Sequence, residues 1–174
     1  MTRTLALAAI TLGLLLVWQA SASAAIKEGT KEVSAFAALS TTDPEVGDST
    51  TQLILQFAGG VFTTPNNQVG GSFTQITAES GGFDATIRII GGFFKYHVNP
   101  DQDTVPYLGA QAGMTFIEAG EFSDSAFSYG GMAGAKFFVS EDLSYNAELN
   151  LLITTIDDQD YTQTTFQVGM SYYF

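Results

Sequence analysis

Few residues in this chain could carry out chemistry, and the first to consider is its single histidine, His97. Acyl transfer or hydrolysis would need a nucleophile beside such a base and a carboxylate to orient it. The two residues that follow are Val98 and Asn99, so no serine stands next to the histidine, and the chain has no cysteine. We therefore expect no enzyme activity, and we expect His97 to hold an interfacial or turn-anchoring position.

A second candidate is the acidic group Asp157, Asp158 and Asp160, whose carboxylates could hold a calcium ion. A solvated loop is the simpler interpretation, because acidic residues also gather in the other expected connections. No phosphate-binding loop or metal-ligand spacing occurs, so we expect no cofactor and no metal. The chain has 18 acidic and 6 basic residues. This balance argues against nucleic acid as a partner, because binding phosphate needs a basic surface.

A third candidate is an ion pair between Lys136 and Glu148, each of which stands at a polar position of an alternating segment. A tight turn near Glu141 would place Lys136 opposite Asn146, and Gly134 opposite Glu148. The lysine and the glutamate would then be diagonal neighbours on one face, within reach of long side chains. If that face lines a closed interior, each charge needs the other. The pattern thus predicts an interior ion pair between Lys136 and Glu148.

The elements that would position these residues are short strands separated by turn-forming clusters, without a helical period. In the fourth strand, Ile87 and Ile89 define the expected apolar face, Arg88 lies opposite and pairs with Asp84 or another acid, and Gly91-Gly92 suggests a bulge. The eight predicted strands cover about 32–40, 51–63, 69–78, 83–98, 106–117, 127–139, 143–153 and 166–174.

The last of these strands alternates between apolar residues at even positions, from Phe166 to Phe174, and polar or small residues between them. The pattern formed by Gln167, Gly169, Tyr172 and Phe174 resembles the insertion signal of bacterial outer-membrane β-barrels. In that family the assembly machinery reads the final strand and pairs it with the first. An ordinary terminal edge strand is the alternative.

The start of the chain has the features of a secretory leader. Arg3 is followed by an apolar run from Leu5 to Trp18, and Ala22-Ser23-Ala24 offers small residues for cleavage. The run is short for a membrane-spanning helix. We predict a signal peptide over residues 1–24, with cleavage after Ala22 as the alternative, followed by one domain over residues 25–174.

The second half of the chain resembles the small opacity-type outer-membrane barrels. The segment Val105-Pro-Tyr-Leu-Gly-Ala-Gln-Ala-Gly113 looks like their fifth strand, and Gly134-Ala-Lys-Phe-Phe-Val-Ser-Glu-Asp-Leu143 looks like their sixth strand and the turn after it. The resemblance implies an eight-stranded antiparallel up-and-down transmembrane β-barrel in the outer membrane, with both termini in the periplasm. It also implies outer-membrane lipids, the barrel assembly machinery and periplasmic chaperones as partners, and a monomer.

Such a barrel would turn its apolar face toward lipid and its polar face inward. Eight strands enclose an interior just wide enough for side chains, so the inward polar residues would largely fill it. We therefore expect a structural or surface-interaction protein. A narrow pore for small or apolar solutes is the alternative, and a lipid-modifying enzyme is a third possibility, disfavoured by the residues after His97.

Overall fold

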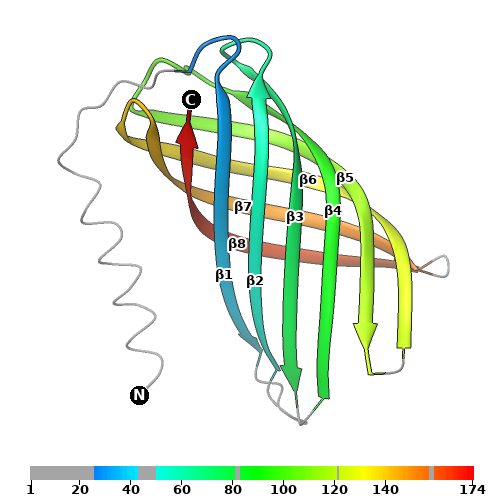
Figure 1. Cartoon of the computed structure of the whole chain (residues 1–174). Helices are drawn as coiled ribbons and strands as arrows, with labels where there is room; N and C mark the ends of the chain where they lie inside the picture. The colour runs from blue at the N-terminus through cyan, green and yellow to red at the C-terminus, as the bar shows by residue number, and fades with distance from the viewer. Residues whose placement is uncertain (1–25, 43–49, 81–82, 121, 157–158) are drawn as a thin grey trace, which may run out of the picture.

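The computed structural model describes residues 26–42, 50–80, 83–120, 122–156 and 159–174, and these form eight antiparallel strands. The strands are β1 (Lys31–Thr42), β2 (Thr50–Phe62), β3 (Asn67–Ser80), β4 (Phe83–His97), β5 (Thr104–Ala119), β6 (Phe122–Ser140), β7 (Leu143–Ile156) and β8 (Gln159–Tyr173). Each strand pairs with the next and β8 pairs with β1, which closes the barrel (Figure 1). The predicted all-β barrel is confirmed. Across the described part of the chain, no helix is long and apolar enough to cross a membrane.

The barrel has two distinct ends. The start of β1, the end of β8 and the short turns at 63–66, 98–103 and 141–142 lie at one end, called here the terminal end (Figure 1). The ends of β1, β3, β5 and β7 and the starts of β2, β4, β6 and β8 lie at the other, the loop end (Figure 1). Most of the added strand length relative to the sequence prediction is at the loop end, where β6 starts at Phe122 and β8 at Gln159. The predicted leader, residues 1–24, and the acidic pair Asp157 and Asp158 lie outside the described residues.

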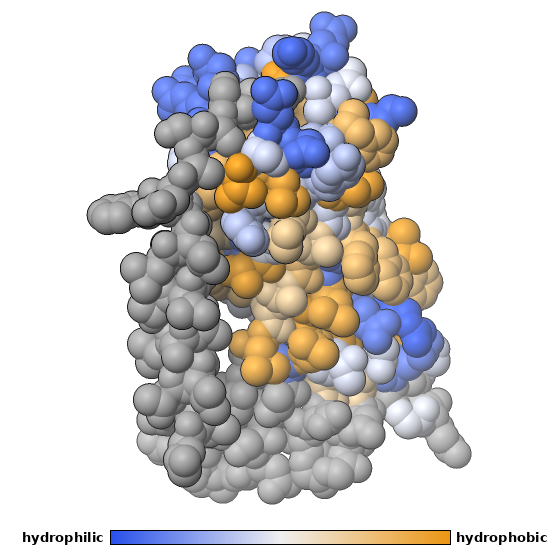
Figure 2. Space-filling model, turned by 60° about the vertical axis from the view of Figure 1, so that its left-hand side comes forward, coloured by the Kyte–Doolittle hydropathy of each residue, from blue (hydrophilic) through white to orange (hydrophobic). Residues whose placement is uncertain are grey.

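The outer surface is apolar, as the alternation predicted. Along β7 the side chains of Tyr145, Leu149 and Leu151 are exposed, whereas Asn146 and Glu148 between them are buried. Figure 2 shows hydrophobic residues gathered over the middle of one face of the barrel, with hydrophilic residues at the terminal end. A monomeric barrel in water would not leave so large an apolar surface uncovered, and a lipid bilayer would cover it.

The facing of β4 is the opposite of the predicted one. Lys95 and His97 point inward and are buried, whereas Ile90, Phe94 and Tyr96 are exposed on the outer surface. The prediction placed isoleucines outside by default. It failed because aliphatic residues also line part of the loop-end interior: Ile89 lines a cavity there, and Ile87 lies on the same side of the strand as Ile89 and Lys95.

Arg88 consequently lies on the outer face. Its Nη1 donates to Oε1 of Glu118 on β5 at 2.7 Å, so the predicted pairing of Arg88 with an acid inside the barrel is wrong. The side chain of Asp84 lies outside the described part of the structure. The register of β4 with β3 and with β5 continues through Gly91 and Gly92 without a shift. The predicted bulge at these two glycines is therefore also wrong.

The seam between β1 and β8 is the shortest pairing in the barrel. Six residues of β1, from Glu32 to Ala37, pair with six residues of β8, from Tyr173 back to Val168. Main-chain hydrogen bonds in both directions between Lys31 and Phe174 extend the seam at the terminal end, at 2.8 and 3.0 Å. Toward the loop end the two strands diverge (Figure 1), and no further register pair joins them in the described part of the chain.

A charge placed on the middle of the outer face should destabilise the barrel. Leu149→Arg is expected to lower the free energy of unfolding in lipid by about 2–4 kcal/mol, because the side chain would face hydrocarbon near the bilayer midplane. Val33→Arg, on the same face but close to the terminal end of β1, should cost about 0–1 kcal/mol. Denaturant titrations of the refolded variants in lipid vesicles measure both. Equal costs at the two depths would contradict the proposed membrane face.

Candidate functional site

The half of the interior next to the terminal end is filled by polar side chains that alternate with the outer apolar ones along their strands. Two glutamates and two lysines form its centre: Glu32 on β1, Lys95 on β4, Lys136 on β6 and Glu148 on β7, called here the ionic cluster. None of the four side chains is more than 4% exposed. Buried charges are costly unless they are paired and hydrogen-bonded. Their ion-pair and hydrogen-bond partners therefore determine whether these charges can be buried without a large cost in stability.

Glu32 receives three hydrogen bonds. The ammonium group of Lys136 donates to its Oε2, and so does Nε2 of Gln68, at 2.9 Å. Oγ of Ser171 donates to its Oε1 at 2.7 Å. Lys136 also donates to the hydroxyl of Tyr173 at 3.2 Å. The carboxylate thus has donors at both oxygens.

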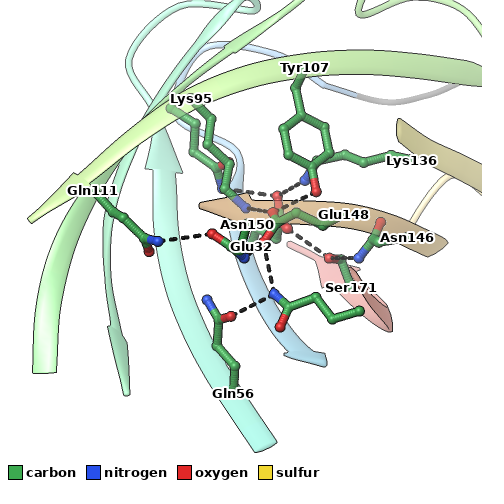
Figure 3. A network of polar contacts seen from close by, with 12 residues as sticks. Glu32, Gln56, Lys95, Tyr107, Gln111, Lys136, Asn146, Glu148, Asn150 and Ser171 are labelled. Atoms are coloured by element: carbon green, nitrogen blue, oxygen red, sulfur yellow. Dashed lines mark hydrogen bonds and ion pairs between the residues drawn. The ribbon is translucent and has the colours of Figure 1, made fainter. Parts of the chain in front are cut away.

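Glu148 receives four hydrogen bonds. Its Oε2 accepts from Nζ of Lys95 at 2.8 Å and from the hydroxyl of Tyr107 at 2.7 Å. Its Oε1 accepts from Nδ2 of Asn150 at 2.6 Å and from Nε2 of Gln167 at 2.8 Å. Figure 3 shows Lys95 and Tyr107 reaching toward Glu148 from another wall of the barrel. Each carboxylate of the ionic cluster is therefore matched by one lysine, and the cluster carries no net charge.

The predicted ion pair between Lys136 and Glu148 needs correction. Both residues are buried inside the barrel, and the predicted register, with Lys136 opposite Asn146 and Gly134 opposite Glu148, is confirmed. The ion pairs, however, are Lys136 with Glu32 and Lys95 with Glu148. Both pairs cross the interior between strands that are not neighbours in the sheet. In this barrel the two lysines thus reach carboxylates across the interior, and neither ion pair joins diagonal neighbours on adjacent strands.

Aromatic and aliphatic side chains close the terminal end beyond the ionic cluster. Ile26, Phe62, Val105, Phe138 and Tyr173 form a buried group, called here the apolar plug. The lysines also lie over aromatic rings: Nζ of Lys95 is 4.8 Å from the ring centroid of Tyr107, and Nζ of Lys136 is 5.3 Å from that of Tyr173. Cation–π contacts of this kind stabilise a desolvated ammonium group. The terminal end is thus packed with apolar and aromatic groups.

His97 belongs to this packed end. Its ring lies between those of Phe62 and Tyr107, with centroids 4.9 and 5.4 Å away, and it is fully buried. Its main chain is bonded in both directions to Asn66 in the turn between β2 and β3. Among the described residues, no hydrogen-bond partner reaches either ring nitrogen. The turn-anchoring role agrees with these contacts, whereas an interfacial position does not.

The loop-end half of the interior is less tightly filled. A cavity lies there, with a volume of about 40 Å³ accessible to the centres of water molecules. Residues from six strands line it, among them aliphatic and amide side chains. On the other side of the barrel, hydroxyl groups of Thr115, Ser128 and Thr154 form a short hydrogen-bonded row. The interior therefore changes from ionic to uncharged along the barrel axis.

The four residues of the predicted insertion signal take two different positions. Gln167 points inward and donates to Gln56 and Glu148. Tyr172 and Phe174 are exposed on the outer face, with their ring centroids 6.1 Å apart. Gly169 lies at the seam opposite Phe36, whose ring occupies the space that a side chain at 169 would fill. Recognition by the assembly machinery remains a prediction. Closure of the barrel also favours glycine at position 169, because the Phe36 ring leaves no room for a side chain there.

Gly169→Ala should therefore weaken the closed barrel. A Cβ atom there would lie 2.6 Å from the Phe36 ring and closer still to the carbonyl oxygen of Ala35, so the seam would have to shift. We expect a cost of about 1–3 kcal/mol, typical of overpacking. Gly71→Ala is the control, because a Cβ on that outward-facing glycine would meet nothing closer than 3.5 Å. Heat-modifiability on gels and unfolding titrations measure the two variants, and equal stability would contradict the proposed role of Gly169.

Two of the four residues in the ionic cluster were missed by the sequence prediction. Glu32 starts a strand in which alanine weakens the alternation, and Lys95 lies on the strand whose facing was inverted. A signal for Lys95 existed. Three basic residues before Asp101 lie in strands: Lys31, Arg88 and Lys95. A closed interior with an inward Glu148 requires a cation.

Comparison with known proteins gives the same architecture. Neisserial surface protein A superposes with a TM-score of 0.69 at 16% identity, covering 84% of this chain and 100% of the other. OprG from Pseudomonas aeruginosa gives a TM-score of 0.56 at 13% identity and coverages of 85% and 97%. Ail from Yersinia pestis gives 0.52 at 18% identity and coverages of 84% and 100%. No curated protein sequence matches the chain. The family model of the outer membrane protein beta-barrel domain matches residues 10–174, so the chain belongs to this family of outer-membrane barrels.

Proposed function

We propose that this outer-membrane barrel is a closed, non-conducting protein with a structural or surface-interaction role. The observation that carries the proposal is the neutral ionic cluster. Both lysines of the ionic cluster form ion pairs with glutamates, and all four side chains are buried. The apolar plug lies beyond them. An ion crossing the barrel would have to break these pairs and displace the plug. The barrel would then serve as a rigid frame that presents its loops.

Ionic conductance tests this proposal against the narrow pore. Reconstituted into a planar lipid bilayer, the protein should show no steady single-channel steps at neutral pH. A variant that removes the closure, Phe62→Gly with Tyr173→Gly, takes two rings out of the apolar plug and should produce leak events if it still refolds. Well-defined conductance steps from the unaltered protein would contradict a closed barrel and favour a pore.

The orientation in the membrane is part of the same proposal. The terminal end would face the periplasm, after export by the predicted signal peptide, and the loop end would face the cell exterior. The acidic loops would then be the surface available to partners, with lipid and the assembly machinery as the other contacts. Because the chain has no cysteine, Thr64→Cys and Asp160→Cys each introduce one thiol. A membrane-impermeant maleimide on intact cells should label position 160 and leave 64 unlabelled, and the reverse pattern would invert the topology.

A further inference from the structure

The cavity in the loop-end half of the barrel contains no charged residue in its lining. Its aliphatic walls come from β2, β3, β4 and β7 and comprise Ile54, Ile76, Ile89 and Leu152. A water molecule needs about 10–15 Å³ of such space, so 40 Å³ admits about three waters. The cavity is therefore large enough for a small chemical group.

The side of the cavity next to the ionic cluster is made of amides. Nε2 of Gln167 donates to Oε1 of Gln56 at 2.6 Å, and Nε2 of Gln111 donates to Oδ1 of Asn150 at 2.9 Å. An amide has two donor hydrogens and a carbonyl acceptor, so this floor retains capacity for a further hydroxyl or amide. It offers no counter-ion, because Lys95 and Lys136 are already paired. Chemistry of this kind favours an uncharged polar group.

The wall of the cavity next to β8 is formed by a strand edge that has no register partner on β1 in the described part of the chain. Gln163, Thr165 and Gln167 line the cavity and belong to the part of β8, residues 159–167, that has no register partner on β1. On the other side of the seam, residues 38–42 of β1 are equally without a partner on β8 in the described part of the chain. Unpaired backbone at membrane depth is tolerated where it borders a polar or wet cavity. An exit from the cavity toward lipid would therefore lie along this part of the seam, beside the cavity-lining residues of β8.

From these features we infer that the cavity binds the small uncharged head group of a single-chain amphiphile, such as a primary alcohol, whose hydrocarbon chain leaves between β1 and β8. The amides and the strand edge bind the head, the isoleucines contact the first carbons, and the apolar outer surface accommodates the chain. Leu39, 72% exposed on the outer face of β1, lies beside this exit. This binding needs no passage through the ionic cluster, so it is independent of whether the barrel conducts.

Methyl NMR of the protein in lipid nanodiscs, labelled with ¹³C at isoleucine methyl groups, tests the site with 1-octanol as the probe. The signals of Ile54, Ile76 and Ile89 should shift and saturate. Ile90, the next residue along β4 but 56% exposed to lipid, is the internal control and should drift without saturation. Octanoate is ionised at pH 8, and its charge finds no partner in the cavity. It should therefore bind at least about tenfold more weakly than 1-octanol. Octane should cause no saturable shift.

Two pairs of variants locate the head group and the chain. Thr165→Trp fills the cavity and should abolish the saturable shifts, whereas Thr164→Trp, on the lipid side of the same strand, should retain them. A nitroxide on Leu39→Cys should broaden the terminal methyl signal of bound octanol more than one on Phe116→Cys, on the opposite wall. Saturable shifts that persist in Thr165→Trp, or equal responses of Ile89 and Ile90, would overturn the site. Equal broadening from the two labels would overturn the exit at the seam.

Discussion

Replacing Lys136 with methionine should lower the free energy of unfolding by about 3–5 kcal/mol, the usual cost of removing one partner of a buried pair. The substitution nearly preserves side-chain volume, so the loss is electrostatic. It leaves Glu32 buried with only the neutral donors Gln68 and Ser171. Urea titrations of the refolded protein in lipid vesicles measure the effect, with unfolding followed by far-UV circular dichroism.

The matching double variant identifies the partner. Lys136→Met combined with Glu32→Gln should recover much of the loss, because both charges are gone. The coupling energy from this cycle should exceed about 1 kcal/mol and should be larger than that of Lys136→Met with Glu148→Gln. A larger coupling with Glu148 would contradict the crossed pairing and would favour the diagonal pair expected from the sequence.

Replacing Glu148 with glutamine should have an effect of similar size, again about 3–5 kcal/mol. Four donors converge on this carboxylate, and one of them is the ammonium group of Lys95. An amide accepts hydrogen bonds only through its oxygen. The substitution would therefore leave the charge of Lys95 without a counter-ion and would point the NH2 group of the new amide at one of the other donors. Adding Lys95→Met should restore stability, since methionine also keeps contact with the surrounding rings.

The same substitution on the outer surface provides the control. Glu118 forms an ion pair with Arg88 at 2.7 Å, but both side chains are about half exposed. Glu118→Gln should therefore change stability by less than about 1 kcal/mol, as exposed ion pairs do. Comparable losses at positions 118 and 148 would mean that the interior pair is as well solvated as the exterior one, which would contradict a sealed interior.

Much of the fold could be predicted from the sequence because the alternation is clear where one face meets lipid and the other a polar interior. The hairpin of β6 and β7 shows this well: its register and the inward facing of Lys136 and Glu148 were both predicted correctly. The same rule failed on β4, where the interior is lined partly by aliphatic residues near Ile89 and is ionic near Lys95. Alternation reports a difference between two faces, and it does not say which face is inside when the interior changes character along its axis.

The ion-pair partners could not be predicted from local spacing. Glu32 and Lys136 are 104 residues apart, and Lys95 and Glu148 are 53 residues apart. Which side chains meet across a closed barrel depends on the stagger of all eight strands and on where aromatic rings such as those of Phe36 and Tyr107 leave room. The sequence indicates how many charges need partners inside the barrel, whereas the choice of partners requires the three-dimensional register.

The most direct test of the sealed interior is the exchange of lysine ammonium protons with water. The chain has four lysines: Lys27 and Lys31 are exposed near the terminal end, and Lys95 and Lys136 lie in the ionic cluster. In lipid nanodiscs at neutral pH, ¹⁵N NMR of labelled lysine side chains should show two slowly exchanging ammonium signals. Lys95→Met and Lys136→Met should each remove one of them, while Lys27 and Lys31 should be broadened by fast exchange. Fast exchange of all four ammonium groups would mean a water-filled interior and would contradict the closed barrel.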